Sequence, residues 1–359
     1  MKLKSKIFVA GGSGMVGSAL LRRLQQKGYE NIVSCYHTRP PKESAFKSIS
    51  FRCLDLTSMQ AVDEFFSIEK PEFVFLAAAK VGGIMANNTY RADFVHINMA
   101  IQDNVIHSSW RHGVEKLLFL GSSCIYPRDC PQPMKEDALL SGPLEYTNEP
   151  YAIAKIAGIR MCESYNLQYG TNFLSVMPTN LYGPNDKFDF RNSHVIPAMI
   201  RKIHCGKLFM EGNSTALMAD LGVESWVSAR KILLQHGVSD SSITLWGTGK
   251  VRREFMYAPD MADASVFIME RLNIADHARD MVETRNTHIN IGVGEDLTIL
   301  ELSEIIRKTI GYVGDILWDA SKPDGTPKKL LDVTRLHSMG WRHVTSLDKG
   351  IALTYQDYR

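Results

Sequence analysis

An apolar run passes directly into a glycine-rich loop at Ile7-Phe8-Val9-Ala10-Gly11-Gly12-Ser13-Gly14-Met15-Val16-Gly17. Three of these glycines, Gly11, Gly14 and Gly17, have a G-x-x-G-x-x-G spacing that opens into a helical pattern. Glycines let the backbone turn tightly and approach a pyrophosphate, while free N–H groups at a helix N-terminus bind anionic oxygens. The spacing alone is weak evidence for a binding site. Its position between a strand and a helix, however, predicts that residues 11–17 bind a dinucleotide. The alternative is a glycine-rich turn without a ligand.

The first half of the chain continues as an alternation of short β-rich runs and amphipathic stretches. Parallel strands need crossover connections, which are usually helices, so this alternation predicts βαβ units. We expect an α/β fold with a Rossmann-type, doubly wound parallel sheet over residues 1–182. Its further strands are expected at Ile32–Tyr36, Phe51–Leu54, Phe73–Ala77, Lys116–Leu120 and Phe173–Met177, and its helices at Met15–Lys27, Met59–Glu69, Phe94–Arg111 and Tyr151–Tyr169.

The pattern becomes irregular after residue 182. Residues 183–359 are expected to form a smaller, partly interleaved α/β domain that binds the substrate. Helices are expected at Val195–Ile203 and Ile299–Ile310, and the pattern leaves open a return of segments near 243–262 and 288–298 to the first domain. The segment Cys205–Asp240 looks helical and polar, and is interpreted as a peripheral insertion.

Composition excludes several classes of function. The 359 residues carry 41 Lys and Arg against 39 Asp and Glu, and a net charge of +2 is too small for a nucleic-acid-binding surface. Neither a signal peptide nor a membrane span is recognisable, so a cytoplasmic protein is expected. The six cysteines are scattered without C-x-x-C pairs, which predicts no disulfide framework and no metal site.

The end of the second expected strand bears on the choice of dinucleotide. An acid there usually bonds a ribose 2′-hydroxyl, whereas a basic residue accommodates a 2′-phosphate. Here the strand runs into His37-Thr38-Arg39, which favours NADP(H), although Arg39 could also simply face solvent. Asp55 follows the third strand, where it could contact adenine or cap the helix that begins near Met59.

Residues of an acid–base site follow later strands. Tyr151 and Lys155 are spaced Tyr-x-x-x-Lys, which places a phenol and an ammonium on one face of a helix. A neighbouring cation would lower the pKa of the tyrosine from about 10 and make it a usable proton donor near neutral pH. The strand Lys116–Leu120 ends in Gly121-Ser122-Ser123-Cys124, at the sheet edge where ligands bind in this architecture.

These features together resemble the extended short-chain dehydrogenase/reductase superfamily and, within it, the GDP-L-fucose synthase family. The second resemblance is specific and covers nearly the whole chain. Its motifs are Ala77–Ile84, Asn87–Tyr90, Gly121–Pro127, Asn148–Lys155, Pro178–Pro184, Asn192–Pro197, Arg253–Phe255 and Asp319–Pro327. Ser13 departs from the family, whose members often carry a basic residue there.

The resemblance implies an enzyme that epimerises GDP-4-keto-6-deoxy-D-mannose at C3 and C5 and then reduces the C4 ketone with NADPH. It also implies a homodimer. Cys124 and His194 match the acid/base positions, against the alternatives of a packing cysteine and a surface histidine. The full implied sets are Ser122, Cys124, Tyr151, Lys155 and His194 for catalysis; residues 11–17, Arg39, Asp55, Ala78, Lys155 and Pro178 for NADP(H); and Asn180, His194, Trp246, Arg253, Lys322 and Asp324 for the GDP-sugar, with Trp246 either stacking on substrate or packing in the core.

Two other interpretations stay open. One is another NDP-sugar epimerase or 4,6-dehydratase, which would show no net oxidation of its cofactor. The other is a catalytically silent NADP(H)-sensing protein, which would need the glycine loop but no acid–base pair.

Overall fold

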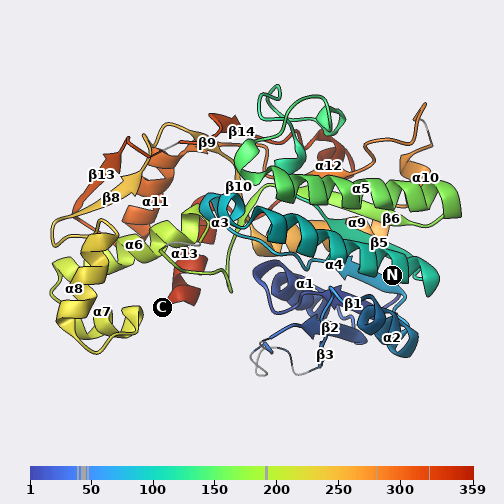
Figure 1. Cartoon of the computed structure of the whole chain (residues 1–359), viewed down its shortest axis with the longest axis horizontal. Helices are drawn as coiled ribbons and strands as arrows, with labels where there is room; N and C mark the ends of the chain where they lie inside the picture. The colour runs from blue at the N-terminus through green and yellow to red at the C-terminus, as the bar shows by residue number, and fades with distance from the viewer. Residues whose placement is uncertain (39, 42–45, 47, 191–192, 280, 323) are drawn as a thin grey trace.

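The computed structural model describes residues 1–38, 40–41, 46, 48–190, 193–279, 281–322 and 324–359. Its centre is a seven-stranded parallel sheet in the order β3-β2-β1-β4-β5-β6-β11 (Figure 1). The strand order reverses between β1 and β4, which is the position where ligands bind in open α/β sheets. The strands are β1 (Ile7–Ala10), β2 (Ile32–Tyr36), β3 (Ser50–Cys53), β4 (Phe73–Leu76), β5 (Lys116–Leu120), β6 (Phe173–Pro178) and β11 (Ile289–Ile291). The predicted Rossmann-type sheet is confirmed.

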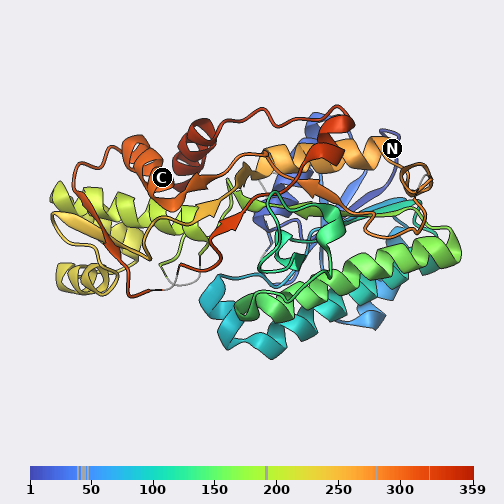
Figure 2. The same ribbon diagram turned by 90° about the horizontal axis from the view of Figure 1, so that it is seen from above.

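Helices cover both faces of this sheet because its strands are apolar on both sides. In β1, Ile7 and Val9 belong to one buried cluster, whereas Phe8 and Ala10 belong to the other. The first cluster packs under α1 (Met15–Gln26) and α9 (Ala258–Arg271), and the second under α2 (Met59–Glu69), α4 (Arg91–Arg111) and α5 (Glu149–Tyr169). Figure 2 shows α4 and α5 side by side on one face and α9 on the opposite face.

A third buried cluster forms a second region of the molecule beyond this sheet, at the left of Figure 1. It contains a parallel pair of strands, β8 and β13, and a layer of helices whose apolar faces meet. The elements are α6 (Val195–Met210), α7 (Ser214–Leu221), α8 (Trp226–Gln235), β8 (Ser242–Trp246), α11 (Ile299–Ile310), β13 (Asp315–Asp319) and α13 (Leu347–Tyr358). Small sheets join the two regions through β7 (Asn180–Tyr182) with β10 (Phe255–Tyr257), and through β12 (Leu297–Thr298), β9 (Arg252–Arg253) and β14 (Lys328–Lys329).

The chain crosses between these regions more than once. α9 and β11 lie between β8 and α11 in the sequence but pack with the large sheet, whereas β8 and α11 belong to the second region. The segment from Cys205 does not begin as a separate element, because Cys205 lies inside α6 and is fully buried. The domain boundary at residue 182 stays a prediction. Among the described helices, none is both long and apolar enough to cross a membrane.

Candidate active site

The glycine loop leaves no room for a side chain at three of its glycines. Gly11 has a φ of +90°, and a Cβ atom there would lie 2.9 Å from the backbone of Ala78. A Cβ on Gly12 would lie 2.0 Å from the Ser34 hydroxyl oxygen, and one on Gly17 would lie 2.1 Å from the Gly11 carbonyl oxygen. Larger residues at these three positions would therefore push apart the loop, β2 and the first turn of α1.

Gly14 differs from its neighbours. It is the N-cap of α1 and makes no side-chain capping bond, so no N-cap side chain pairs with the first-turn N–H groups of the helix. A Cβ on Gly14 would meet only the Gly11 carbonyl oxygen, at an ordinary distance of 3.6 Å. This glycine is not required by protein packing. The space in front of it fits the close approach of a pyrophosphate to a helix N-terminus.

The residues predicted to select the dinucleotide follow β2 and β3 in the sequence. Arg39 is outside the described residues, so the predicted preference for NADP(H) over NAD(H) does not rest on its observed position. Asp55 is exposed and accepts hydrogen bonds from the Thr57 hydroxyl at 2.7 Å and the Thr57 N–H at 2.9 Å, which lower its pKa. Ser58, not Asp55, caps α2 by accepting from Ala61, so the capping alternative for Asp55 is wrong.

The end of β5 carries the predicted serine and cysteine. The chain turns there through a short 3₁₀ helix, η2 (Ser123–Ile125), and the Ser122 hydroxyl caps it by accepting from the Cys124 N–H at 3.3 Å. The Cys124 sulfur accepts a hydrogen bond from the Asn148 amide at 3.2 Å. Cys124 is half-buried, which excludes the alternative of a fully packed core cysteine.

Tyr151 and Lys155 lie on the first turns of α5, opposite this loop. The Lys155 ammonium is buried, donates to the Leu120 carbonyl oxygen at 2.7 Å and lies 4.8 Å from the Phe119 ring centre. Burial lowers the pKa of Lys155 to about 7. It raises the pKa of Tyr151, which the charge of Cys124 raises further and the Ser122 hydroxyl lowers.

The predicted lowering of the tyrosine pKa by its lysine is therefore wrong for this structure. Two physical reasons account for it. Burial disfavours phenolate more strongly than the nearby polar groups favour it. The Lys155 nitrogen is also directed at the end of β5, 5.8 Å from the centre of the Tyr151 ring. Tyr151 consequently stays protonated near neutral pH and can act as a hydrogen-bond donor.

Arg253 brings a positive charge to the same place from β9. Burial lowers its pKa, while the charges of Asp324 and Cys124 raise it. Asp324 is itself held by the Thr248 N–H and hydroxyl, both at 2.7 Å, and these bonds lower its pKa. The charge of Arg253 thus acts on Cys124 at the strand end of β5.

Other predicted substrate residues lie further out. Trp246 ends β8 with 62% of its surface exposed, and the Lys322 ammonium lies 5.7 Å from its ring centre. The core-packing alternative for Trp246 is therefore wrong. The Asn180 amide donates to the Glu254 carbonyl oxygen at 2.9 Å, so it braces the strand end next to Arg253.

His194 enters the region from the second half of the chain. It is the N-cap of α6 and is exposed, so the alternative of a surface histidine stays open. Desolvation by neighbouring protein atoms lowers its pKa. The residue before it, Ser193, approaches Gly83 in the loop after β4. Within the described residues the His194 ring has no hydrogen-bond partner, so the structure does not join it directly to Cys124. Pro178 ends β6, in the same sheet as β5.

The sequence patterns indicate no role for Asn148 and Glu254 beside this site, or for Lys202 in the second region. Asn148 is the first residue of the Asn148–Lys155 motif, which predicts roles for Tyr151 and Lys155 only. Lys202 is an α6 lysine that donates to the Thr244 carbonyl oxygen on β8, and burial lowers its pKa to about 8. Glu254 is fully buried and accepts from the N–H groups of Val293 at 2.7 Å and Gly294 at 2.8 Å. The sequence offers two signals for them. Lys202 lies on an apolar helix face, and Glu254 directly follows Arg253, a predicted substrate-binding residue.

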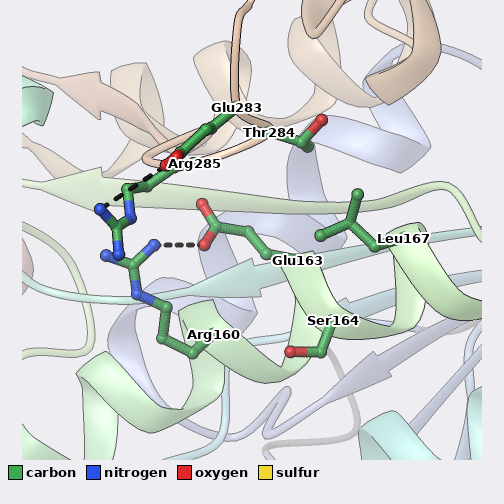
Figure 3. A pocket seen from close by; sticks show the side chains of 7 residues that line it. All are labelled: Arg160, Glu163, Ser164, Leu167, Glu283, Thr284 and Arg285. Carbon is green, nitrogen blue, oxygen red and sulfur yellow. Dashed lines mark hydrogen bonds and ion pairs between the residues drawn. The ribbon is translucent and has the colours of Figure 1, made fainter.

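A hollow on the outer face of α5 is separate from this cluster (Figure 3). Arg160 and Glu163 form an ion pair of 2.5 Å there, and the Glu163 carboxylate also accepts from Thr287. Its charges are satisfied by one another, and we assign it no function. Its lining residues are Arg160, Glu163, Ser164, Leu167, Glu283, Thr284 and Arg285.

The glycine loop after β1, the serine at the end of β5 and the Tyr-x-x-x-Lys pair on α5 define a dinucleotide-dependent enzyme class. Residues 7–292 match the NAD dependent epimerase/dehydratase family. The chain belongs to this family and, within it, to the group of the GDP-L-fucose synthases.

Individual relatives support this placement. The chain is 48% identical over 355 residues to GDP-L-fucose synthase of Escherichia coli K12, covering 98% of this chain and 96% of the relative. It is 41% identical, with a TM-score of 0.90, to a GDP-D-glycero-L-gluco-heptose synthase from Campylobacter jejuni solved in the presence of NADPH, with 100% and 99% coverage. It is 42% identical, with a TM-score of 0.91, to a GDP-6-OMe-4-keto-L-xylo-heptose reductase from the same organism, with 100% and 98% coverage.

Proposed function

We propose that this protein converts GDP-4-keto-6-deoxy-D-mannose into GDP-L-fucose with NADPH, by epimerisation at C3 and C5 and reduction at C4. The observation that carries the proposal is the grouping of Cys124 with Ser122, Tyr151 and Arg253 at the carboxyl edge of the sheet, in a chain 48% identical to a GDP-L-fucose synthase. A sensor of NADP(H) has no need of such a group.

The epimerisations need an acid and a base. A ketone at C4 acidifies the hydrogens on C3 and C5, so each inversion removes one proton and returns one to the opposite face. Cys124 and His194 supply these groups, because a thiol and an imidazole both titrate within reach of neutral pH. The lowered pKa of His194 keeps its ring neutral and able to accept a proton.

One oxyanion site serves both parts of the reaction. Ser122 and Tyr151 donate hydrogen bonds to the C4 oxygen, which bears negative charge in each enolate and again during reduction. Tyr151 then gives its proton to this oxygen. Bound NADPH supplies the hydride to C4. Lys155 and the N-terminus of α1 hold the cofactor, and Arg253 pairs with the diphosphate of the substrate.

A second function is favoured by the Campylobacter relative named as a 4-keto-heptose reductase, at 42% identity. Reduction alone needs Ser122, Tyr151 and Lys155 but neither Cys124 nor His194. The two functions therefore differ in product stereochemistry and not in NADPH consumption.

The deciding experiment is incubation of the purified protein with GDP-4-keto-6-deoxy-D-mannose and NADPH in deuterated water. We expect one NADPH oxidised per product, deuterium at C3 and C5, and an NMR spectrum of GDP-L-fucose. NADPH oxidation without deuterium would indicate the reductase. Deuterium or dehydration without NADPH oxidation would indicate another epimerase or a dehydratase, and no turnover would indicate the sensor.

A homodimer and a cytoplasmic location belong to the same proposal. Both come from the sequence and from the family resemblance. Sedimentation equilibrium of the purified chain tests the first: a mass of one 40.3 kDa chain would contradict it.

A further inference from the structure

Asn148 is the neighbour that contacts the sulfur of Cys124. Its side-chain amide nitrogen lies 3.2 Å from that sulfur. Asn148 ends a short 3₁₀ turn, η4 (Tyr146–Asn148), directly before α5, and its backbone N–H donates to the Glu145 carbonyl oxygen at 3.1 Å. The turn and the helix thus fix the backbone of Asn148 beside the loop at the end of β5.

The other end of the same amide is unusual. The Asn148 side-chain oxygen is buried, and it has no hydrogen-bond partner among the described residues. Most buried polar atoms are paired, so an unpaired acceptor beside a candidate catalytic thiol calls for a physical explanation. An N–H group donates to a thiolate. An amide turned end for end would instead offer its oxygen to an S–H donor.

We propose that Asn148 is the positioning residue for Cys124, and that its amide serves both protonation states of the sulfur. The nitrogen end stabilises the thiolate that removes a substrate proton, and the oxygen end receives the S–H of the thiol that returns one. Because the Asn148 side-chain oxygen has no partner among the described residues, rotation of the amide breaks no hydrogen bond at this oxygen. This inference rests on the proposed role of Cys124 in epimerisation.

The other groups that face Cys124 cannot do this. Arg253 carries a fixed positive charge and can favour only the thiolate. Tyr151 stays protonated, because burial raises its pKa, and it is committed to the C4 oxygen. Ser122 accepts from the Cys124 backbone N–H and so fixes the loop rather than the sulfur.

The first test measures the sulfur directly and needs no substrate. Iodoacetamide labelling is followed by mass spectrometry of the Cys124 peptide, with the exposed Cys53 of the same chain as the internal reference. We expect Asn148→Leu to lower the ratio of Cys124 to Cys53 labelling at pH 7.5 about tenfold, as for the loss of one hydrogen bond to a charged group. Asn148→Asp should lower it further, because a carboxylate repels the thiolate, and this variant keeps the size of the side chain.

A neighbouring substitution separates this role from general support of the turn. Among the described residues, Thr147 bonds only the Glu145 carboxylate in the same turn, so Thr147→Ala should leave the labelling ratio unchanged. A ratio that is unchanged in Asn148→Leu and Asn148→Asp, or lowered equally in Thr147→Ala, would overturn the proposal.

The second test measures exchange of the C3 and C5 hydrogens with deuterated water. Asn148→Leu should lose about tenfold in exchange rate while its NADPH dissociation constant stays unchanged. Labelling and exchange that fall together support the proposal. Exchange that is unchanged in Asn148→Leu overturns it. Absence of exchange in the unmodified protein would instead contradict the proposed function, while the labelling ratio would still report the contact with Cys124.

Discussion

The loop after β1 and the loop after β5 lie at the same edge of one sheet, but different forces hold them. The first is set by close packing, with Gly12 against Ser34 and Gly17 against the Gly11 carbonyl oxygen. The second is set by hydrogen bonds and charges, which join Cys124 to Asn148 and Arg253. A binding loop and a reaction centre thus tolerate different changes: the first should respond to volume and the second to hydrogen bonding and charge.

The largest expected effect comes from an almost isosteric change at Tyr151, which lies opposite the loop after β5. Tyr151→Phe removes the proton donor without changing the ring's volume, so turnover should fall about 10²–10⁴-fold. NADPH binding and the melting temperature should stay near those of the unmodified protein. Stopped-flow NADPH oxidation and fluorescence titration measure the two effects. Normal turnover would remove Tyr151 from the site.

Substitution of the acid–base pair should separate epimerisation at C3 and C5 from reduction at C4. Cys124→Ser and His194→Gln should each slow hydrogen exchange at C3 or C5 about 10²–10⁴-fold. Reduction of the unepimerised ketone should persist, because the C4 step needs neither group, and should give a different GDP-6-deoxyhexose. Mass spectrometry and NMR of the product measure this. Complete exchange at both carbons in both variants would show that other groups act as the acid and base.

Local sequence signals predict the bounds of several strands and helices in both regions. The expected bounds of β2, α2, β5 and α11 coincide with the observed ones, because apolar periodicity and turn residues are short-range signals. Ends that depend on long-range packing are harder to predict. α6 extends to Met210, seven residues beyond its expected end, because its last turns are buried by contacts with distant elements.

The chemical details of the site depend on contacts that no local pattern contains. The contact between Asn148 and Cys124 joins positions 24 residues apart, and the charge of Arg253 acts on Cys124 from another sheet. The direction of the Tyr151 pKa depends on burial, which spacing alone does not reveal. Motifs therefore predict which residues gather, and the fold determines their protonation.

The packed loop should respond to volume in a graded way. Gly17→Ala forces a Cβ to within 2.1 Å of a backbone oxygen, so it should destabilise the protein by about 1–3 kcal/mol. Gly14→Ala meets only an ordinary contact and should leave stability unchanged while weakening NADPH binding. Urea unfolding and cofactor titration measure both. Equal destabilisation by the two substitutions would show that packing does not distinguish the glycines.

The smallest expected effect tests whether charge at the reaction centre reaches the stability of the whole fold. Burial lowers the pKa of Lys155 to about 7, whereas an unfolded lysine titrates at about 10.4. Between these values the folded protein holds fewer protons than the unfolded chain, so stability rises with pH there, by at most about 1.4 kcal/mol per pH unit. Below pH 7 Lys155 is protonated in both states, so the folded protein bears the full cost of the buried charge.

Lys155→Met keeps the apolar stem and removes the titration. Urea unfolding of the cofactor-free protein at pH 7, 8 and 9 should therefore show a flatter rise in stability for the variant than for the unmodified chain. Lys202, whose pKa is about 8, titrates in the same window, but it does so in both proteins and cancels in the difference. Identical slopes would mean that Lys155 stays charged beside the Leu120 carbonyl oxygen. Hydrogen bonding would then outweigh desolvation at this position, and the contrast between a charge-sensitive and a volume-sensitive loop would rest on Tyr151 and Cys124 alone.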